Sequence, residues 1–187
     1  MWGDYGIIVM QRKTSNLKGA KLTMYNLVYG DISSIPCEVM VNSSNGRGYM
    51  GGKACAVKLK KGVAESMQFA THGLIETEAK NAVRSFGKKA FFLWFARKFF
   101  FVTSSCGLPC KIVFHAVTMR NPASRSSIKA VYNCLMSLKR YCTDNGFTDI
   151  ALPMLGCGNG GVCKEVFLKY VSIVFSEPLW KIKVVDK

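Results

Sequence analysis

Short hydrophobic runs alternate along this chain with amphipathic segments, and clusters of glycine and polar residues separate them. Apolar or β-branched runs of about four to eight residues bounded by turn formers are typical of buried strands, whereas apolar residues recurring every third or fourth position indicate helices. The pattern predicts strands within residues 21–31, 37–42, 111–117, 149–155 and 181–185, and helices within residues 53–61, 63–70, 74–86, 126–146 and 162–175. Strands that alternate with helices predict an α/β sandwich with a largely parallel sheet.

The clearest predicted helix lies within residues 126–146. Its apolar side chains fall on one face: Val131, Leu135, Leu138 and Cys142. Either Ser126 or Ser127 is suited to cap its start, and Asn145-Gly146 is suited to end it.

The 187 residues are enough for one domain with a sizeable core. We expect an irregular N-terminal lead-in over residues 1–20 and a single domain over residues 21–187. The run "AFFLWFARKFFFV", residues 90–102, is too short and too charged to span a bilayer. We favour a buried strand, bent near Arg97-Lys98; the alternative is an exposed surface for a membrane or a partner.

The charge is strongly positive, with 26 Lys and Arg against 11 Asp and Glu, a formal net charge of +15. Either a lysine-rich solvated surface or an affinity for polyanions such as nucleic acid accounts for it.

The eight cysteines form no Cys-x-x-Cys pair, and there are only two histidines. We therefore expect no metal site, no disulfide framework and no cofactor. The start of the chain lacks the order of a signal peptide, so we expect a cytoplasmic or nuclear monomer, not a secreted one.

Two glycine-rich segments each follow a predicted buried strand. They are residues 45–52 and residues 156–161. Loops at the carboxyl ends of parallel strands line the ligand site of α/β proteins, and glycine lets backbone N–H groups approach a phosphate. Each segment alone also fits a tight strand-to-helix connection, but two in equivalent positions predict a ligand that carries phosphate. Neither has the spacing of a P-loop or of a dinucleotide fingerprint.

Four segments in order give a family resemblance: "GDISSIPCEVMVNSSN", "MGGKACAV", "VTSSCGLPCKIVFHAV" and "IALPMLGCGNGG". The first is similar to a Gly-Asp-Ile-Thr start followed by a strand ending Val-Asn-Ala-Ala-Asn. The last is similar to a Pro-x-x-x-Gly-x-Gly-x-x-Gly phosphate loop. On these segments, residues 21–187 resemble the macro-domain family of ADP-ribose-binding modules. The resemblance implies a three-layer α/β/α sandwich with a mixed, largely parallel central sheet.

The resemblance also implies a site. Its ADP-ribose-binding residues are Asp31, Ile32, Asn45, Gly51, Gly52, Gly156, Cys157, Gly158, Asn159 and Gly160. Asp31 would accept a hydrogen bond from the adenine amino group, and Asn45 would contact the distal ribose. The two glycine-rich loops would cover the diphosphate from either side with their N–H groups.

Three further residues are expected to lie outside these ADP-ribose contacts. Asn42 is expected to tie the strand end to a neighbouring loop, and His115 is expected to be a core histidine. Asp186, after the last strand, would border the adenine pocket.

The chain departs from the family pattern where hydrolytic members keep their acids. Lys53 stands where a third glycine is usual, and residues 54–57 carry no carboxylate. Met119 and Gly160 occupy the positions of a lysine and an aspartate that another subgroup uses. Asn45 is left as the candidate catalytic residue, and residues 88–103 look like an insertion.

The resemblance therefore implies binding of ADP-ribose or of ADP-ribosylated targets. Weak hydrolysis of ADP-ribosyl bonds or of ADP-ribose 1″-phosphate stays open beside it. The alternative function is a basic nucleic-acid-binding protein with a vestigial nucleotide pocket.

Overall fold

The computed structural model describes residues 8–9, 25–86, 100–122 and 124–186. In that part of the chain the strands are β1 (Ile8–Val9), β2 (Tyr25–Tyr29), β3 (Val39–Asn45), β4 (Phe100–Ser104), β5 (Ile112–Met119), β6 (Asp149–Pro153) and β7 (Lys181–Asp186). The helices are η1 (Ile32–Ser34, a 3₁₀ turn), α1 (Lys53–Val57), α2 (Val63–Ala70), α3 (Leu74–Ser85), α4 (Ile128–Asn145) and α5 (Lys164–Val174).

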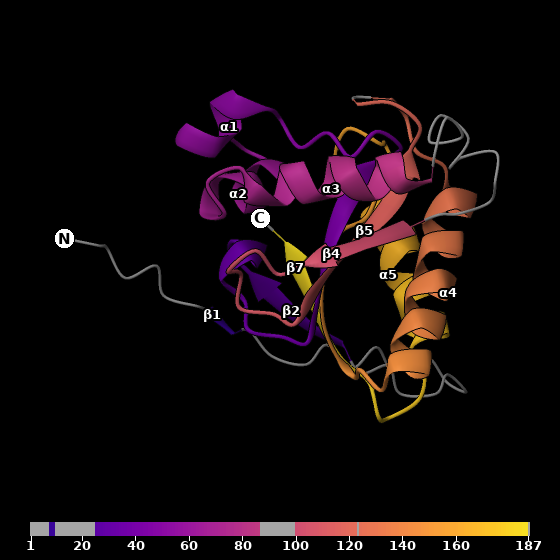
Figure 1. The fold of residues 1–187 in the computed structure, drawn as a ribbon. Coiled ribbons are helices and arrows are strands. Elements are labelled where there is room, and N and C mark those ends of the chain that lie inside the picture. Colours follow the sequence, from indigo (N-terminus) through magenta and orange to yellow (C-terminus); the bar gives the residue numbers. More distant parts are fainter. Residues whose placement is uncertain (1–7, 10–24, 87–99, 123, 187) are drawn as a thin grey trace.

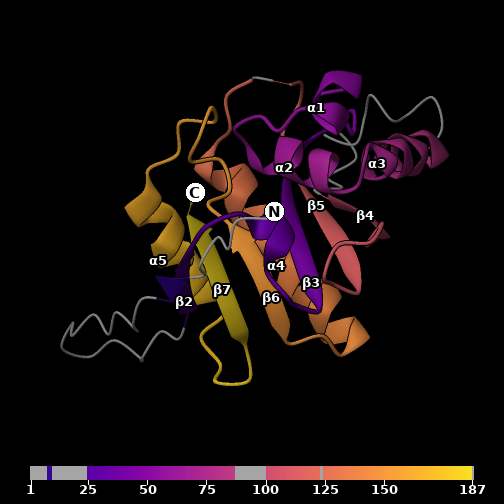
Figure 2. The ribbon, with the colours of Figure 1, turned by 90° about the vertical axis from the view of Figure 1, so that its left-hand side faces the viewer.

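These strands form one mixed sheet in the order β1-β2-β7-β6-β3-β5-β4. Five consecutive strands of the sheet are parallel to one another: β2, β7, β6, β3 and β5. The two edge strands, β1 and β4, pair antiparallel with their neighbours. Figure 2 shows the order of the central strands across the sheet. The predicted α/β sandwich with a largely parallel sheet is confirmed.

Side-chain alternation along the central strands separates two cores. On β3, Val39 and Val41 pack with residues of α4 and α5, whereas Met40 packs with residues of α2 and α3. All three side chains are fully buried. Because successive strand residues point to opposite faces, an unbroken apolar run such as this one requires cover on both sides. Figure 1 shows that cover, with α1–α3 on one side of the sheet and α4 and α5 on the other.

Most predicted elements are found, with differences of extent; β3, for example, continues to Asn45 where the predicted strand ends at residue 42. Helix α1 ends at Val57 rather than continuing to Lys61, and Lys58 has an extended backbone. The side chains of residues 58–61 are all exposed, so no apolar face is available to prolong the helix by packing. Within the expected N-terminal lead-in, β1 pairs with Val28 and Tyr29 of β2.

The apolar run at residues 90–102 is only partly described, because residues 87–99 lie outside the described residues. Its last three residues belong to β4, where Phe101 is buried and Phe100 stacks on Phe114 of β5 at 4.6 Å between ring centroids. For this end of the run, burial in a strand is confirmed. No helix in the described ranges has both the length and the hydropathy of a membrane-spanning segment.

Helix α4 begins and ends where its capping residues predict. Ser127 is the N-cap, and its Oγ accepts a hydrogen bond from Ala130 N at 3.2 Å. The Ser126 hydroxyl instead donates to Thr118 O at the end of β5. Gly146 closes the helix in the left-handed region, with a φ of 71°. Ser127 therefore resolves the choice between the two serines.

We predict that Ser127→Ala lowers the free energy of unfolding by about 1 kcal/mol, because the Ala130 N–H loses its acceptor. Ser127→Asp keeps an acceptor at the N-cap and is expected to unfold close to the wild type. Urea denaturation followed by circular dichroism measures both. Equal destabilisation by the two substitutions would contradict this capping role.

Candidate functional site

The segments expected to bind a ligand meet at one edge of the sheet. Strands β2, β7, β6, β3 and β5 are parallel, so the segments that follow them all leave from the same edge. Strands β3 and β6 are direct neighbours, which places the first loop (residues 45–52) beside the second loop (residues 156–161). The arrangement is typical of ligand sites in α/β proteins.

Asn45 shapes the first loop from the strand side. Its Oδ1 accepts hydrogen bonds from Arg47 N at 3.0 Å and Tyr49 N at 3.3 Å, and its Nδ2 donates to Tyr49 O at 2.7 Å. Gly46 N donates to Met119 O at 3.0 Å, which ties the loop to the end of β5. Asn45 is nearly fully buried, so its first role is to fold the loop back on itself.

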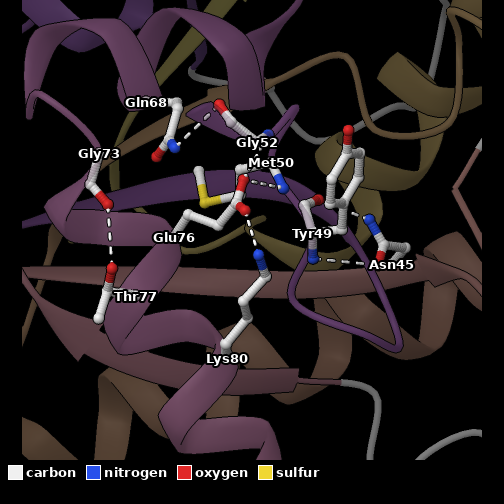
Figure 3. A network of polar contacts seen from close by, with 9 residues as sticks. All are labelled: Asn45, Tyr49, Met50, Gly52, Gln68, Gly73, Glu76, Thr77 and Lys80. Carbon is white, nitrogen blue, oxygen red and sulfur yellow. Dashed lines mark hydrogen bonds and ion pairs between the residues drawn. The ribbon is translucent and has the colours of Figure 1, made fainter. Parts of the chain in front are cut away.

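Glu76 of α3 holds the same loop from the helix side, as Figure 3 shows. One of its oxygens, Oε2, accepts from Met50 N at 2.9 Å and from Gly52 N at 2.8 Å, while Oε1 pairs with Lys80. The glutamate is 4% exposed. Burial by itself would raise the pKa of this carboxyl, but the Lys80 ammonium and the two N–H groups outweigh burial, and the pKa is lowered. A buried, ionised carboxylate thus anchors the loop.

This contact changes the expected role of Gly52. Its N–H group already donates to Glu76, so in this conformation it is not a donor for a diphosphate. Gly51, with a φ of 102°, has a backbone that favours glycine, and a Cβ there would lie 2.5 Å from Cys55 Sγ. Within the described ranges the Gly51 N–H has no acceptor. The first loop therefore offers fewer N–H groups than its sequence suggests.

The second loop has the opposite character. Val162 N donates to Gly156 O at 3.0 Å and Gly161 N donates to Gly158 O at 3.1 Å, which closes the loop into a compact turn. Among the described residues, the N–H groups of Gly156, Gly158, Asn159 and Gly160 have no acceptor. Gly158 and Asn159 are exposed. Unbonded, exposed backbone donors of this kind are suited to bind an anion.

One detail of the second loop corrects an expectation from the sequence, and two of its glycines differ in the reason for their small size. Cys157 N donates to Met154 O at 3.1 Å, so it is not a free donor. Gly158 does not have a positive φ, and a Cβ there would meet nothing within 4 Å. Unusual backbone angles are therefore not the reason for glycine at position 158. At Gly160 space is the reason, since a Cβ would lie 2.5 Å from Gly156 O.

The end of β2 forms a separate group at the same edge. Asp31 caps η1, with Oδ1 accepting from Ser33 N at 3.0 Å and Ser33 Oγ at 2.9 Å, and Ile32 is buried. Gly30 N donates to Asp186 O, which joins the ends of β2 and β7. The Asp186 carboxylate pairs with Lys164 at 2.8 Å, at the start of α5. Asp31 and Asp186 are thus brought together by neighbouring strands.

His115 lies in the core, as predicted. Its Nδ1 is 3.1 Å from Asn42 Nδ2, its Nε2 is 3.0 Å from Thr103 Oγ1, and its ring stacks on Phe101. The expected partner of Asn42 was wrong, because Asn42 bonds to His115 of the neighbouring strand rather than to a loop. Complete burial lowers the pKa of His115 to about 3, so the ring is neutral.

We predict that the His115 ring in the folded protein shows no NMR titration between pH 5 and 8. In the unfolded chain the pKa of this ring is about 6.5, and in the folded protein it is about 3. Between these two pH values the unfolded state binds more protons than the folded state. The stability that depends on the neutral ring is therefore complete above about pH 6.5 and is lost as the pH falls toward 3. A ring that titrates near neutral pH in the folded protein would contradict its burial.

No acidic residue lies within the first loop or the first helix after it. Residues 54–57, Met119 and Gly160 contribute no carboxylate, as the sequence shows. The carboxylates that approach the loop come from the following helices: Glu76 from α3, and Glu65 from α2, whose Cγ would lie 3.4 Å from a Cβ at Gly51. Sequence reasoning missed both, because a glutamate in an amphipathic helix is usually a surface residue. Within the described ranges, no group of three or more His, Cys, Asp and Glu is placed to hold a metal ion.

The sheet order and the flanking helices define a three-layer α/β/α fold, with the two glycine-rich loops at one edge of its sheet. A family model for the Macro domain matches residues 41–171, and the chain belongs to this family. Uncharacterized proteins of Aquifex aeolicus and Aeropyrum pernix are 32% and 28% identical to it, over 141 and 134 residues. These alignments cover 75% and 71% of this chain, and 73% and 60% of the two relatives.

Solved structures with the same fold include three macrodomain proteins. The macrodomain of Mycobacterium tuberculosis DarG has a TM-score of 0.70 and 21% identity, covering 88% of this chain and 99% of that one. The Oceanobacillus iheyensis macrodomain with ADP has a TM-score of 0.68 and 16% identity, covering 96% and 88%. Thermosipho africanus DarTG in complex with ADP-ribose has a TM-score of 0.60 and 18% identity, covering 86% and 41%. At these identities the likeness concerns the fold.

Proposed function

We propose that this chain binds ADP-ribose, free or attached to a macromolecule, at the carboxyl edge of its parallel strands. The observation that carries the proposal is the second loop, where Gly158, Asn159 and Gly160 present backbone N–H groups without acceptors among the described residues. Family membership and the ADP-ribose and ADP complexes of structural relatives support the same ligand.

We propose that the diphosphate lies at the second loop and the distal ribose at the first loop, beside Asn45. The adenine would lie near Asp31 and Ile32, where the ends of β2 and β7 are joined by the Gly30 N to Asp186 O bond. Asn45 Nδ2 carries two N–H groups and uses one for Tyr49 O, so the other is available for a ribose hydroxyl.

Binding is proposed as the main activity, with hydrolysis of ADP-ribosyl bonds as a slow reaction at the same site. The residues at 54–57, Met119 and Gly160 supply neither acid nor base, and loss of a general base costs about a hundredfold or more. Burial raises the pKa of the Cys157 thiol to about 11, so it is not a nucleophile at neutral pH. What remains is orientation of the substrate by Asn45 and the two loops.

Calorimetric titration with ADP-ribose, ADP and AMP tests the proposed function. We expect ADP-ribose to bind more tightly than ADP, because only ADP-ribose reaches the first loop, and AMP to bind least because it lacks the second phosphate. Equal affinities for ADP-ribose and ADP would remove the first loop from the site. Absence of binding for all three would refute the proposed function.

Gly158→Val tests the second loop. The position is open and has no strained backbone, so we expect the variant to fold with wild-type stability while its side chain occupies the space of the diphosphate. ADP-ribose affinity is predicted to fall by at least about a hundredfold, a loss of roughly 2.7 kcal/mol. Gly158→Ala, with a smaller side chain, is expected to lose less. A Val variant that binds normally would mean that this loop faces away from the ligand.

Hydrolysis of an ADP-ribosylated carboxylate is expected to be slow and to depend on Asn45. Asn45→Ala is predicted to lower the rate by roughly tenfold to a hundredfold, because both the ribose contact and the shape of the loop change. Lys53→Ala is the matched variant; its side chain is exposed at the first position of α1, and we expect a near wild-type rate. Release of ADP-ribose measured by chromatography gives both rates. Fast turnover that requires Lys53 would contradict this assignment.

A further inference from the structure

Glu76 occupies a position that neither the sequence motifs nor the proposed binding contacts include. We infer that Glu76 is a positioning residue whose carboxylate fixes the backbone conformation of the first loop. Because it accepts hydrogen bonds from the N–H groups of Met50 and Gly52, the phosphates of the ligand would bind at the second loop. The inference rests on the proposed binding of ADP-ribose and divides that function between the two loops.

The contacts at Gly52 show how completely the loop is held. The N–H groups of Met50 and Gly52 converge on a single carboxylate oxygen, Glu76 Oε2. On the other side of the same residue, Gln68 Nε2 of α2 donates to Gly52 O at 3.4 Å. Both polar groups of Gly52 are therefore bonded to buried side chains of the helical layer. Neither can turn toward a ligand without taking a hydrogen-bond partner from a buried carboxylate or amide.

The rest of the loop follows the same face of α3. Residues 76, 79 and 80 are three and four positions apart, so they lie on one side of the helix. A Cβ at Gly48 would lie 2.9 Å from the Ala79 carbonyl, which shows that the loop backbone rests directly on the helix. Lys80 Nζ lies 5.7 Å from the centre of the Tyr49 ring while it pairs with Glu76. Helix α3 thus serves as the support for residues 48–52.

This support has a consequence for what each loop can bind. An anion at the first loop would meet one unbonded N–H, that of Gly51, between two N–H groups already bonded to a carboxylate. The second loop contains no acidic residue from Gly156 to Val162, and three of its N–H groups at 158–160 have no acceptor in the described part of the chain. The neutral distal ribose suits the first loop and the diphosphate suits the second. Glu76 then governs the preference for ADP-ribose over ADP, and the second loop governs affinity for both.

Glu76→Ala separates these two contributions. We expect ADP-ribose affinity to fall by about tenfold, because the first loop loses the acceptor for two N–H groups, while ADP affinity changes by less than about twofold. Glu78→Ala is the matched control on the same helix, since Glu78 accepts from Ser104 N and Oγ of β4 and does not contact the loop. It is expected to leave the ratio of the two affinities unchanged.

Glu76→Gln distinguishes positioning from a requirement for charge. A glutamine oxygen can accept both N–H groups, as Oε2 does, so we expect this variant to restore most of the preference for ADP-ribose. A Glu76→Ala protein that loses ADP and ADP-ribose affinity equally, or loses neither, would overturn the inference. The first result would make Glu76 a residue of general stability, and the second would make it irrelevant to the site.

Amide NMR of the wild-type protein tests the same inference without any variant. In the free protein, the Met50 and Gly52 amides should exchange slowly with solvent and Gly51, between them, quickly. On titration with ADP, the amide signals of Gly158, Asn159 and Gly160 should shift while those of Met50 and Gly52 stay in place. Fast exchange of Met50 and Gly52, or shifts confined to them, would refute the role of Glu76. Failure of the proposed function is read separately, as absence of ADP-ribose binding by a wild-type protein whose amide exchange is as expected.

Discussion

Backbone N–H and C=O groups in the segments that follow sheet strands need hydrogen-bond partners. The two glycine-rich loops of this macro domain meet that requirement in opposite ways. Except at the Gly51 N–H, the first loop is bonded from within the protein, by Asn45 on the strand side and Glu76 on the helix side. The second loop bonds to itself at its base and leaves the N–H groups of Gly158, Asn159 and Gly160 without acceptors among the described residues. Gly158 and Asn159 are exposed, whereas Gly160 is buried. Buried donors are almost always paired, so the unpaired Gly160 N–H supports the proposed external acceptor at this loop.

Within the second loop, the groups available to a ligand are neutral backbone donors. The proposed phosphate loop has no basic side chain between Gly156 and Val162, although the whole chain carries a net charge of +15. A diphosphate there would be held by backbone dipoles at short range. The lysines at 53, 58, 60 and 61 are exposed on and after α1, so solvent and salt screen their charges. Overall charge and site chemistry are therefore separate properties of this molecule.

Much of the fold follows from local patterns in the sequence. Alternating apolar positions of β3 require cover on both faces, and the capping residues of α4 mark both of its ends. The position of the two loops also follows from the sequence, because each comes directly after a buried parallel strand. The family motifs then predict that Asn45 and the segment 156–160 are parts of one site.

The remaining features depend on contacts between distant parts of the chain. Glu76 lies 24 residues after Gly52, in a helix whose other charged residues look solvated, and nothing local indicates that its side chain is buried. Asn42 and His115 are separated by 73 residues, so the partner of Asn42 is set by strand order, which the sequence pattern leaves open. The same holds for Cys157 N, whose bond to Met154 O depends on how the loop closes. Sequence motifs located the loops, but tertiary packing decides which of their N–H groups are free.

A crystal structure of the ADP-ribose complex measures this division of the two loops most directly. We predict diphosphate oxygens within hydrogen-bond distance of the N–H groups of Gly158, Asn159 and Gly160, with Met50 and Gly52 still bonded to Glu76. A diphosphate bound by the Met50 and Gly52 N–H groups, with Glu76 displaced from them, would contradict it.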